Sequence, residues 1–321
     1  MTKAIRTAIT CLFLVTAIQA VMCNNSTDPK SFFPSIDGNL TRIAWAHAVN
    51  SQEKLAIALK NDAIMMLEAD VSLGNDTTNT TNMNVPIMAH PPNTTSDLTL
   101  QNFLKTVIDS NTTKGIKLDF KSIEAFNASK PVLENKMNEL AFPVFLNADI
   151  LPGPVNATAL PVDAKAFLSG AKAFTNYTLS VGWTTRYDAA QNGTKNGYTT
   201  KQIQAMIDVL KEQNVTQPIT YPVRAALAVN DVAAMESLIK KSPGSSNATL
   251  TVWSNEKDVV DADQLSTLIK QIGVSKVYVD VPADLAKKLN LSGASSVGVA
   301  ATTTVASLLI GMFLPTIVRR L

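Results

Sequence analysis

Glu68 and Asp70 stand two positions apart, so both carboxylates lie on one face of an extended strand. They mark the end of an apolar run, Ile64 to Leu73, which is too continuous for a half-exposed surface strand and predicts a buried one. Repulsion and desolvation raise the pKa values of two such acids unless a cation or a basic group lies between them. We therefore expect a metal site or a pair neutralised by a base, with a helix cap or a solvated strand end as the structural alternative.

Four further residues with chemical potential follow other short apolar runs: His47, His90, Asp119 and Lys121. The two histidines are the only ones among 321 residues. Three carboxylates, counting Asp119, suit Mg²⁺ or Ca²⁺, whereas zinc would recruit the histidines. Both imidazoles would then remain as a general acid and base, and Lys121 would contact a phosphate oxygen. The implied reaction is attack on a phosphodiester held by the metal.

These side chains meet only if the fold gathers the ends of several strands. Eight short β-rich runs are expected, at Ile43 to Val49, Ile64 to Leu73, Gly115 to Phe120, Pro143 to Ile150, Thr178 to Thr184, Pro218 to Ala225, Ala248 to Ser254 and Lys276 to Val281. Helical patterns lie between them, at Gln52 to Lys60, Leu98 to Ile108, Ile123 to Leu140, Ala164 to Phe174, Thr200 to Gln213, Val232 to Lys240 and Ala262 to Ile272. This alternation predicts an α/β fold, a single closed (β/α)₈ TIM-type barrel rather than an open doubly wound sheet.

Local signals refine this fold. Six helices are expected to follow a capping residue, namely Asp97, Ser122, Asp163, Thr199, Asp231 or Asp261. The region 74–93 breaks the alternation and contains an extra strand, Val85 to Ala89, before His90. It predicts a β-hairpin insertion after the second strand, at the end of the barrel where catalytic sites are built.

The mouth of the predicted barrel offers candidate substrate contacts at the ends of later strands. These are Asn147 and Asp149 on the fourth, Arg224 on the sixth and Trp253 on the seventh, together with Lys121. Arg224 is expected either to bind an anionic substrate or to pair with Asp149 or another acid of the barrel. Trp253, like Trp183, is either a substrate platform or part of core or rim packing.

The segments that carry these residues resemble the signature segments of the menorin family. They are Ala46-His47-Ala48-Val49-Asn50-Ser51, Glu68-Ala69-Asp70-Val71-Ser72-Leu73-Gly74, Pro86-Ile87-Met88-Ala89-His90-Pro91-Pro92 and Lys117-Leu118-Asp119-Phe120-Lys121-Ser122. Further segments match around Leu146 to Leu151, Leu179 to Thr185, Pro222 to Ala225 and Leu250 to Trp253, so the resemblance covers about Ile43 to Val281.

The menorin family is similar in turn to the PLC-like phosphodiesterase barrels of glycerophosphodiesterases and spider-venom phospholipase D toxins. The resemblance implies acid–base roles for His47 and His90, a phosphate contact for Lys121 and Mg²⁺ ligation by the three acids. The chain departs from those enzymes at Ala48, where glycerophosphodiesterases have arginine, and it lacks the toxins' disulfide-closed loop and C-terminal plug motif. The resemblance therefore implies no particular phospholipid or glycerophosphodiester substrate.

Menorin relatives are extracellular proteins of cell-surface complexes that guide neuronal branching. The resemblance thus also implies an alternative function, non-enzymatic recognition of an extracellular receptor or adhesion protein. The formal net charge is only +2, with basic and acidic residues interspersed, which argues against nucleic acid as a partner.

The two ends of the chain predict export. Residues 1–23 read as a signal peptide, residues 24–290 as the barrel, and residues 291–321 as a GPI-attachment signal or a single transmembrane anchor that tethers the protein outside the cell. The only cysteines, Cys11 and Cys23, lie in or at the edge of the signal, so the mature domain has no internal disulfide. Fourteen glycosylation sequons fit this route, at Asn24, Asn25, Asn39, Asn75, Asn79, Asn93, Asn111, Asn127, Asn156, Asn176, Asn192, Asn214, Asn247 and Asn290.

Overall fold

The computed structural model describes residues 27–187, 196–244 and 246–293. Eight strands lie side by side, and each neighbouring pair is parallel. In spatial order they are β1 (Trp45–Ala46), β2 (Met66–Asp76), β5 (Gly115–Phe120), β6 (Val144–Pro152), β7 (Thr178–Thr184), β8 (Ile219–Arg224), β9 (Thr249–Trp253) and β10 (Val277–Asp280). The eight predicted strands are therefore all present, in the order expected of a TIM-type barrel. The expected signal peptide and most of the expected anchor lie outside the described residues, as do Asn24, Asn25 and Asn192.

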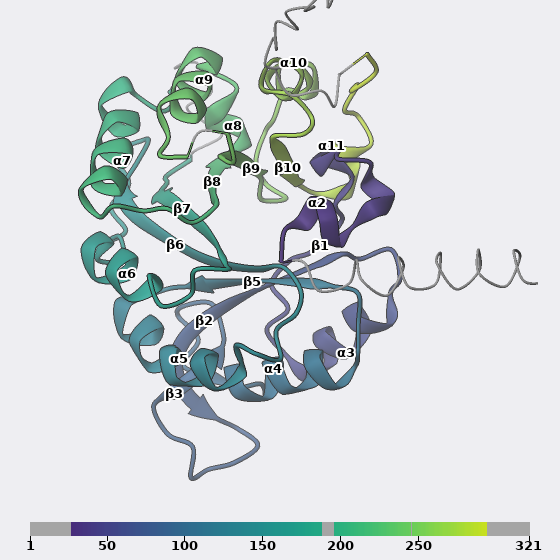
Figure 1. Ribbon diagram of the computed structural model, residues 1–321, viewed down its shortest axis with the longest axis vertical. Helices are drawn as coiled ribbons and strands as arrows, with labels where there is room; N and C mark the ends of the chain where they lie inside the picture. Colours follow the sequence, from purple (N-terminus) through teal and green to yellow (C-terminus); the bar gives the residue numbers. More distant parts are fainter. Residues whose placement is uncertain (1–26, 188–195, 245, 294–321) are drawn as a thin grey trace, which may run out of the picture.

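Helices surround the strands (Figure 1). The longer ones are α3 (Gln52–Lys60), α4 (Leu100–Asp109), α5 (Ile123–Lys136), α6 (Ala164–Ala171), α7 (Thr200–Glu212), α9 (Val232–Lys241) and α10 (Ala262–Ile272). Short turns of helix are α2 (Pro29–Phe32), η1 (Pro34–Ile36), η2 (Leu40–Arg42), α8 (Ala225–Ala228) and α11 (Ala283–Ala286). Within the described residues, no helix combines the length and the apolar character that crossing a membrane requires.

Five of the six predicted helix caps are confirmed, because each of those side chains accepts a hydrogen bond from a backbone N–H of the first turn. The prediction for Asp97 is wrong. Helix α4 begins after Thr99, whose hydroxyl accepts from the N–H of Asn102 at 3.1 Å. The carboxylate of Asp97 instead accepts from the backbone N–H of Gln52, the first residue of α3, at 3.2 Å. Asp97 thus accepts a hydrogen bond from the first turn of α3, which lies 45 residues earlier in the sequence, and not from α4.

The barrel is nearly closed rather than closed, because β1 and β10 share no hydrogen-bonded ladder. Strand β1 is only two residues long, since Ala48 adopts a left-handed conformation (φ +53°) that no strand can continue through. Side chains span the gap instead. The rings of Trp45 and Tyr278 pack edge to face at 6.1 Å, and Nδ1 of His47 lies 3.1 Å from Oδ2 of Asp280.

Strand β2 is longer than predicted and carries the insertion. It continues to Asp76, so the expectation that the strand ends at Glu68 and Asp70 is wrong. Its outer part pairs antiparallel with β3 (Val85–Met88) and parallel with β4 (Thr95–Ser96), and the connection between β2 and β3 projects from the body of the molecule (Figure 1). Neighbouring β5 ends at Phe120, paired with Val71, so the two acids still lie at the mouth.

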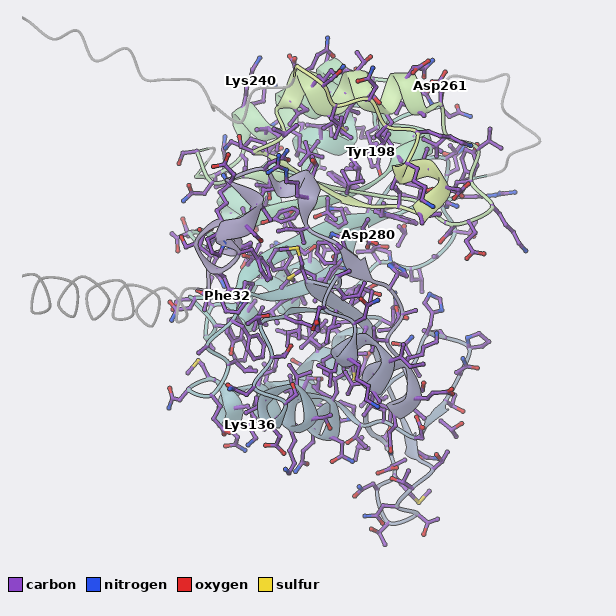
Figure 2. The ribbon with its side chains drawn as sticks, turned by 90° about the vertical axis from the view of Figure 1, so that its right-hand side faces the viewer. Phe32, Lys136, Tyr198, Lys240, Asp261 and Asp280 are labelled. Atoms are coloured by element: carbon purple, nitrogen blue, oxygen red, sulfur yellow. The ribbon has the colours of Figure 1, made fainter. Side chains whose placement is uncertain are left out.

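The floor beneath the mouth is aromatic. Trp45, Phe145 and Tyr278 come from three different strands, and their ring centroids lie 5.5–6.2 Å apart in edge-to-face contacts. Figure 2 shows Asp280, two residues beyond Tyr278, near the middle of the molecule, with Lys240 and Lys136 at opposite ends. The polar groups of the mouth therefore lie next to a layer of packed aromatic rings.

Candidate functional site

The three predicted metal ligands converge. Glu68 and Asp70 come from β2 and Asp119 from β5, where Asp119 lies in register with Asp70. One carboxylate oxygen of each residue lies within 4.8 Å of the other two. Glu68 is 2% exposed and Asp70 is 5% exposed, so these two are shielded from solvent, whereas Asp119 is half-buried. In-register positions of neighbouring parallel strands point to the same face, which is why the local spacing brought these residues together.

A base also lies among these acids. Nζ of Lys121 is 2.7 Å from Oδ1 of Asp70 and forms a second ion pair with Asp119. Burial raises the pKa of Asp119, but the charges of Lys121 and Lys117 outweigh burial and hold this pKa below its ordinary value. Burial likewise works against the ammonium, yet the charges of Asp119 and Asp70 raise the pKa of Lys121. Neutralisation by a base, one of the two arrangements expected from the sequence, is therefore present.

Amide groups orient the carboxylates. The side-chain amide of Asn50 donates to Oδ2 of Asp70 at 2.7 Å, while its carbonyl oxygen accepts from the backbone N–H of Asp70 at 2.9 Å. Asn147 donates to Oδ1 of Asp119 at 2.6 Å and accepts from the hydroxyl of Ser180 at 2.5 Å. Asn147, a predicted substrate contact, thus holds a predicted metal ligand in place. Asn50 and Ser180 were not singled out by their sequence positions.

His47 lies beside Glu68. Because Ala48 is left-handed, its own backbone N–H donates to Oε2 of Glu68 at 2.8 Å. Nδ1 of His47 lies 3.6 Å from the same oxygen. Burial lowers the pKa of His47, but Asp280 and Glu68 outweigh burial and raise this pKa to about 9, so the imidazole is protonated at neutral pH. Burial also raises the pKa of Glu68, an effect that His47 opposes and the charge of Asp70 reinforces.

Two partners in this cluster escaped the sequence interpretation. Asp280 ends the last strand, and its only signal was that barrel closure places the last strand next to the first. Lys117 is 4% exposed, with Nζ 5.8 Å from the centroid of the Trp45 ring. Lys117 and Asp119 lie on one face of β5, and Lys121, just after the strand, continues the two-residue spacing, which was the available signal.

Asp149 faces the same mouth. An added Cβ on Gly182 would lie 2.8 Å from Oδ1 of Asp149, so only glycine fits opposite this carboxylate. Burial raises the pKa of Asp149 to about 7, and the charge of Asp119 adds to the rise while Lys121 and Lys117 oppose it. Asp149 therefore titrates near neutral pH.

We expect Asp149→Asn to be more stable than the wild type at pH 8 in EDTA. The folded state binds this proton more tightly than the unfolded state, whose ordinary value is 3.8. The stabilisation is complete below pH 4 and is lost as the pH rises through about 7. Asparagine carries no titratable proton, so the variant should gain up to about 4 kcal/mol at pH 8 and nothing below pH 4. Urea unfolding at both pH values measures this, with Asp208→Asn on α7 as the control. An equal gain at both pH values would contradict the assignment.

His90 is not brought into the cluster by any hydrogen bond. It is exposed on the loop after β3, and its Nδ1 lies 2.6 Å from the carbonyl oxygen of Pro91. The base of the loop is tied to the site, since the N–H of Ala89 donates to the carbonyl of Asp70 at 3.0 Å. The acid–base role of His90 stays a prediction.

Arg224 is paired, but not with Asp149. Its Nε and Nη2 donate to the two carboxylate oxygens of Asp258 at 2.8 and 2.6 Å. The guanidinium carbon lies 5.1 Å from the centroid of Tyr187 and 5.3 Å from that of Trp253. Trp253 therefore packs on Arg224. Trp183 is 1% exposed and packs against Tyr198 and Tyr221, so it is a core residue.

Most of the predicted glycosylation acceptors are accessible. Eleven of the fourteen lie in the described residues, and ten of these are exposed, the exception being half-buried Asn39. Their use for glycosylation stays a prediction.

Solved structures similar to this chain include the Ignisphaera aggregans GH53 catalytic domain, at 11% identity and a TM-score of 0.41, covering 75% of this chain and 84% of that one. The catalytic domain of a hyperthermophilic chitinase from Pyrococcus furiosus is similar at 13% identity and a TM-score of 0.43, covering 75% and 83%. No conclusion about activity rests on either likeness.

Sequence relatives are more informative. Residues 39–286 match the Menorin N-terminal domain family. Protein FAM151B of Homo sapiens is 39% identical over 240 residues, which cover 74% of this chain and 82% of that protein. The matched span contains the acid cluster, both histidines and the ion pair of Arg224 with Asp258. This chain belongs to the menorin family.

Proposed function

We propose that the protein is a metal-dependent phosphodiesterase that acts on a phospholipid or a glycerophosphodiester. The observation that carries the proposal is the convergence of three carboxylates, two of them buried, within 4.8 Å of one another, with the His47 imidazole beside them. Metal ions that activate phosphoryl groups are commonly held by carboxylates in this way.

The donor set fits a hard divalent cation. Glu68, Asp70 and Asp119 offer only carboxylate oxygens, the ligands that Mg²⁺ and Ca²⁺ prefer, and amides of Asn50 and Asn147 hold two of them in position. Burial raises the pKa of Glu68, and the charges of Asp70 and Asp119 add to the rise while His47 and Lys117 oppose it, so a cation in this cluster would stabilise the ionised carboxylate. When bound there, Mg²⁺ would polarise the phosphoryl group and offset its developing charge.

His47 would donate the proton to the leaving oxygen. Its Nδ1 is held by Asp280, which leaves Nε2 for the substrate, and its raised pKa keeps the proton in place at neutral pH. Lys121, which is paired with Asp70 and Asp119, would contact a phosphate oxygen of the substrate, as the family resemblance implies. His90 would act from its loop as the base that activates the attacking water, as the family resemblance implies.

Metal binding is tested by calorimetric titration with MgCl₂ and, separately, CaCl₂. Glu68→Gln keeps the size of the side chain but removes one charged ligand, and we expect its Kd to rise at least about 10-fold relative to the wild type. The control, Glu256→Gln, alters an exposed acid outside the cluster and should leave the Kd unchanged. Equal Kd values for wild type and Glu68→Gln would refute the assignment of the ion to this cluster.

We also propose that the enzyme works outside the cell, tethered by residues 291–321 through a GPI anchor or a single transmembrane span. The exposure of ten sequon asparagines supports this location. Expression in animal cells tests it. A phosphatidylinositol-specific phospholipase should release the protein from the surface if the anchor is GPI, whereas retention of a surface protein indicates the span.

A further inference from the structure

A second hollow of about 680 Å³ opens at the ends of β7, β8 and β9, away from the acid cluster. Arg186 and Tyr187 follow β7, Arg224 ends β8, and Asn255, Glu256, Lys257 and Asp258 lie in the loop after β9. Three cationic and two anionic side chains line it, which leaves a formal charge of +1. The acid cluster is negative, so the mouth has two halves of opposite sign.

Arg224 is built into this hollow rather than lying freely on the surface. Its side chain is 11% exposed and that of Asp258 is 2% exposed. Two contacts hold its surroundings: the hydroxyl of Tyr198 accepts from its backbone N–H at 2.9 Å, and the hydroxyl of Tyr187 donates to the carbonyl of Val259 at 3.1 Å. The guanidinium is therefore fixed in orientation before any ligand arrives.

One nitrogen of this guanidinium remains available. Nε and Nη2 are engaged by Asp258, whereas Nη1 makes no hydrogen bond to any residue in the described part of the chain and is not among its buried unpaired atoms. An accessible N–H pair on a fixed guanidinium, with Arg186 and Lys257 exposed on the same hollow, is suited to a phosphate or carboxylate.

Strand pairing connects the hollow to the catalytic half. Trp253 lies in register with Arg224 on one side and with Asp280 on the other, and Asp280 contacts His47. Arg224 and the His47 imidazole are therefore separated by two strands, β9 and β10, so an elongated substrate is needed to contact both. Arg224 also covers a face of Trp253 and a face of Tyr187, where a quaternary ammonium would otherwise be attracted.

We propose that this hollow binds a second anionic group of the substrate, a phosphate or carboxylate on the headgroup beyond the scissile phosphodiester. That the bound group belongs to a substrate rests on the proposed function. Binding of an anion in the hollow does not depend on it. It predicts preference for anionic over choline headgroups. The anionic group belongs either to a lipid or to a soluble glycerophosphodiester.

The first experiment measures binding of inorganic phosphate in EDTA by calorimetry and by NMR chemical-shift mapping of the whole protein. We expect Arg186→Gln/Lys257→Gln to weaken binding at least about 10-fold relative to the wild type. The control, Lys201→Gln/Lys240→Gln on α7 and α9, removes the same net charge and should change the Kd less than 2-fold. Thermal melting verifies that both variants are folded. Equal Kd values for the two double variants, shifts confined to the acid cluster, or no phosphate binding by the wild type would overturn the proposal.

The second experiment compares turnover of lysophosphatidylinositol 4-phosphate, lysophosphatidylcholine and soluble glycerophosphoinositol 4-phosphate. We expect kcat/KM at least about 10-fold higher for both inositol phosphates than for the choline lipid. A preference confined to the lipid assigns the anion to a membrane headgroup. Phosphate binding without any hydrolysis would contradict the proposed phosphodiesterase activity but support anion binding in the hollow. Hydrolysis that does not depend on headgroup charge would contradict anion binding in the hollow but support the phosphodiesterase activity.

Discussion

His47→Ala is expected to lower kcat for phosphodiester hydrolysis by about 10²–10⁴-fold, the usual loss when a general acid is removed. His47 is the imidazole adjacent to the acid cluster, its Nδ1 is held 3.1 Å from Asp280, and its pKa is raised to about 9. Alanine leaves no group to protonate the leaving oxygen. Headgroup release from a glycerophosphodiester in saturating MgCl₂ measures the loss.

Asp280→Asn provides a graded comparison. It keeps a hydrogen-bonding group opposite His47 but removes the charge that keeps the imidazole protonated, so we expect a smaller loss, about 10-fold. The thermal midpoint of His47→Ala should stay close to that of the wild type, because the side chain of His47 is 57% exposed. Wild-type turnover by His47→Ala would exclude His47 as the acid. No hydrolysis by the wild-type protein with any divalent cation would reject the proposed reaction.

Phe145→Ala is expected to reduce the free energy of unfolding by about 3–5 kcal/mol, the largest stability effect that we predict. The side chain is fully buried and packs edge to face on Trp45 at 6.2 Å and Tyr278 at 5.5 Å. Those two rings belong to β1 and β10, which share no backbone ladder. Removing Phe145 therefore opens a cavity and loosens the contact that holds the first and last strands together.

Urea unfolding followed by tryptophan fluorescence and circular dichroism measures this loss. Ile57→Ala, at a 61% exposed position on α3, is the matched control and should cost about 0.5 kcal/mol or less. A loss below about 1 kcal/mol for Phe145→Ala would mean that the aromatic floor does not hold the barrel seam.

Much of the fold could be read from local pattern. The bounds of β5, β7, α3 and α10 agree with the predicted ones, and the other barrel strands and long helices overlap theirs. Apolar runs of strand length and helix periodicity are properties of a few successive residues, so they can be recognised without knowing which element packs against them. Other bounds differ: α5 ends at Lys136, before the predicted Leu140, and β2 continues to Asp76, where β3 and β4 pair with it.

The candidate site divides in the same way. Glu68, Asp70 and Asp119 could be grouped from their two-residue spacing and from the rule that parallel strands end together at the mouth. The pairing of His47 with Asp280 could not, because these residues are 233 positions apart and meet only across the barrel seam. Arg224 likewise found Asp258, which lies beyond the strand that the pattern identified.

The sequence by itself determined the barrel class, the eight strands and the acids that point into the mouth, since backbone periodicity assigns each side chain to a face. Only the tertiary structure decided how these charges are partnered. It placed Lys121 between Asp70 and Asp119, Asp280 against His47, and His90 on an exposed loop without a hydrogen bond to the acids. Ion pairing depends on distances between side chains from different strands, and those distances exist only once the barrel has formed.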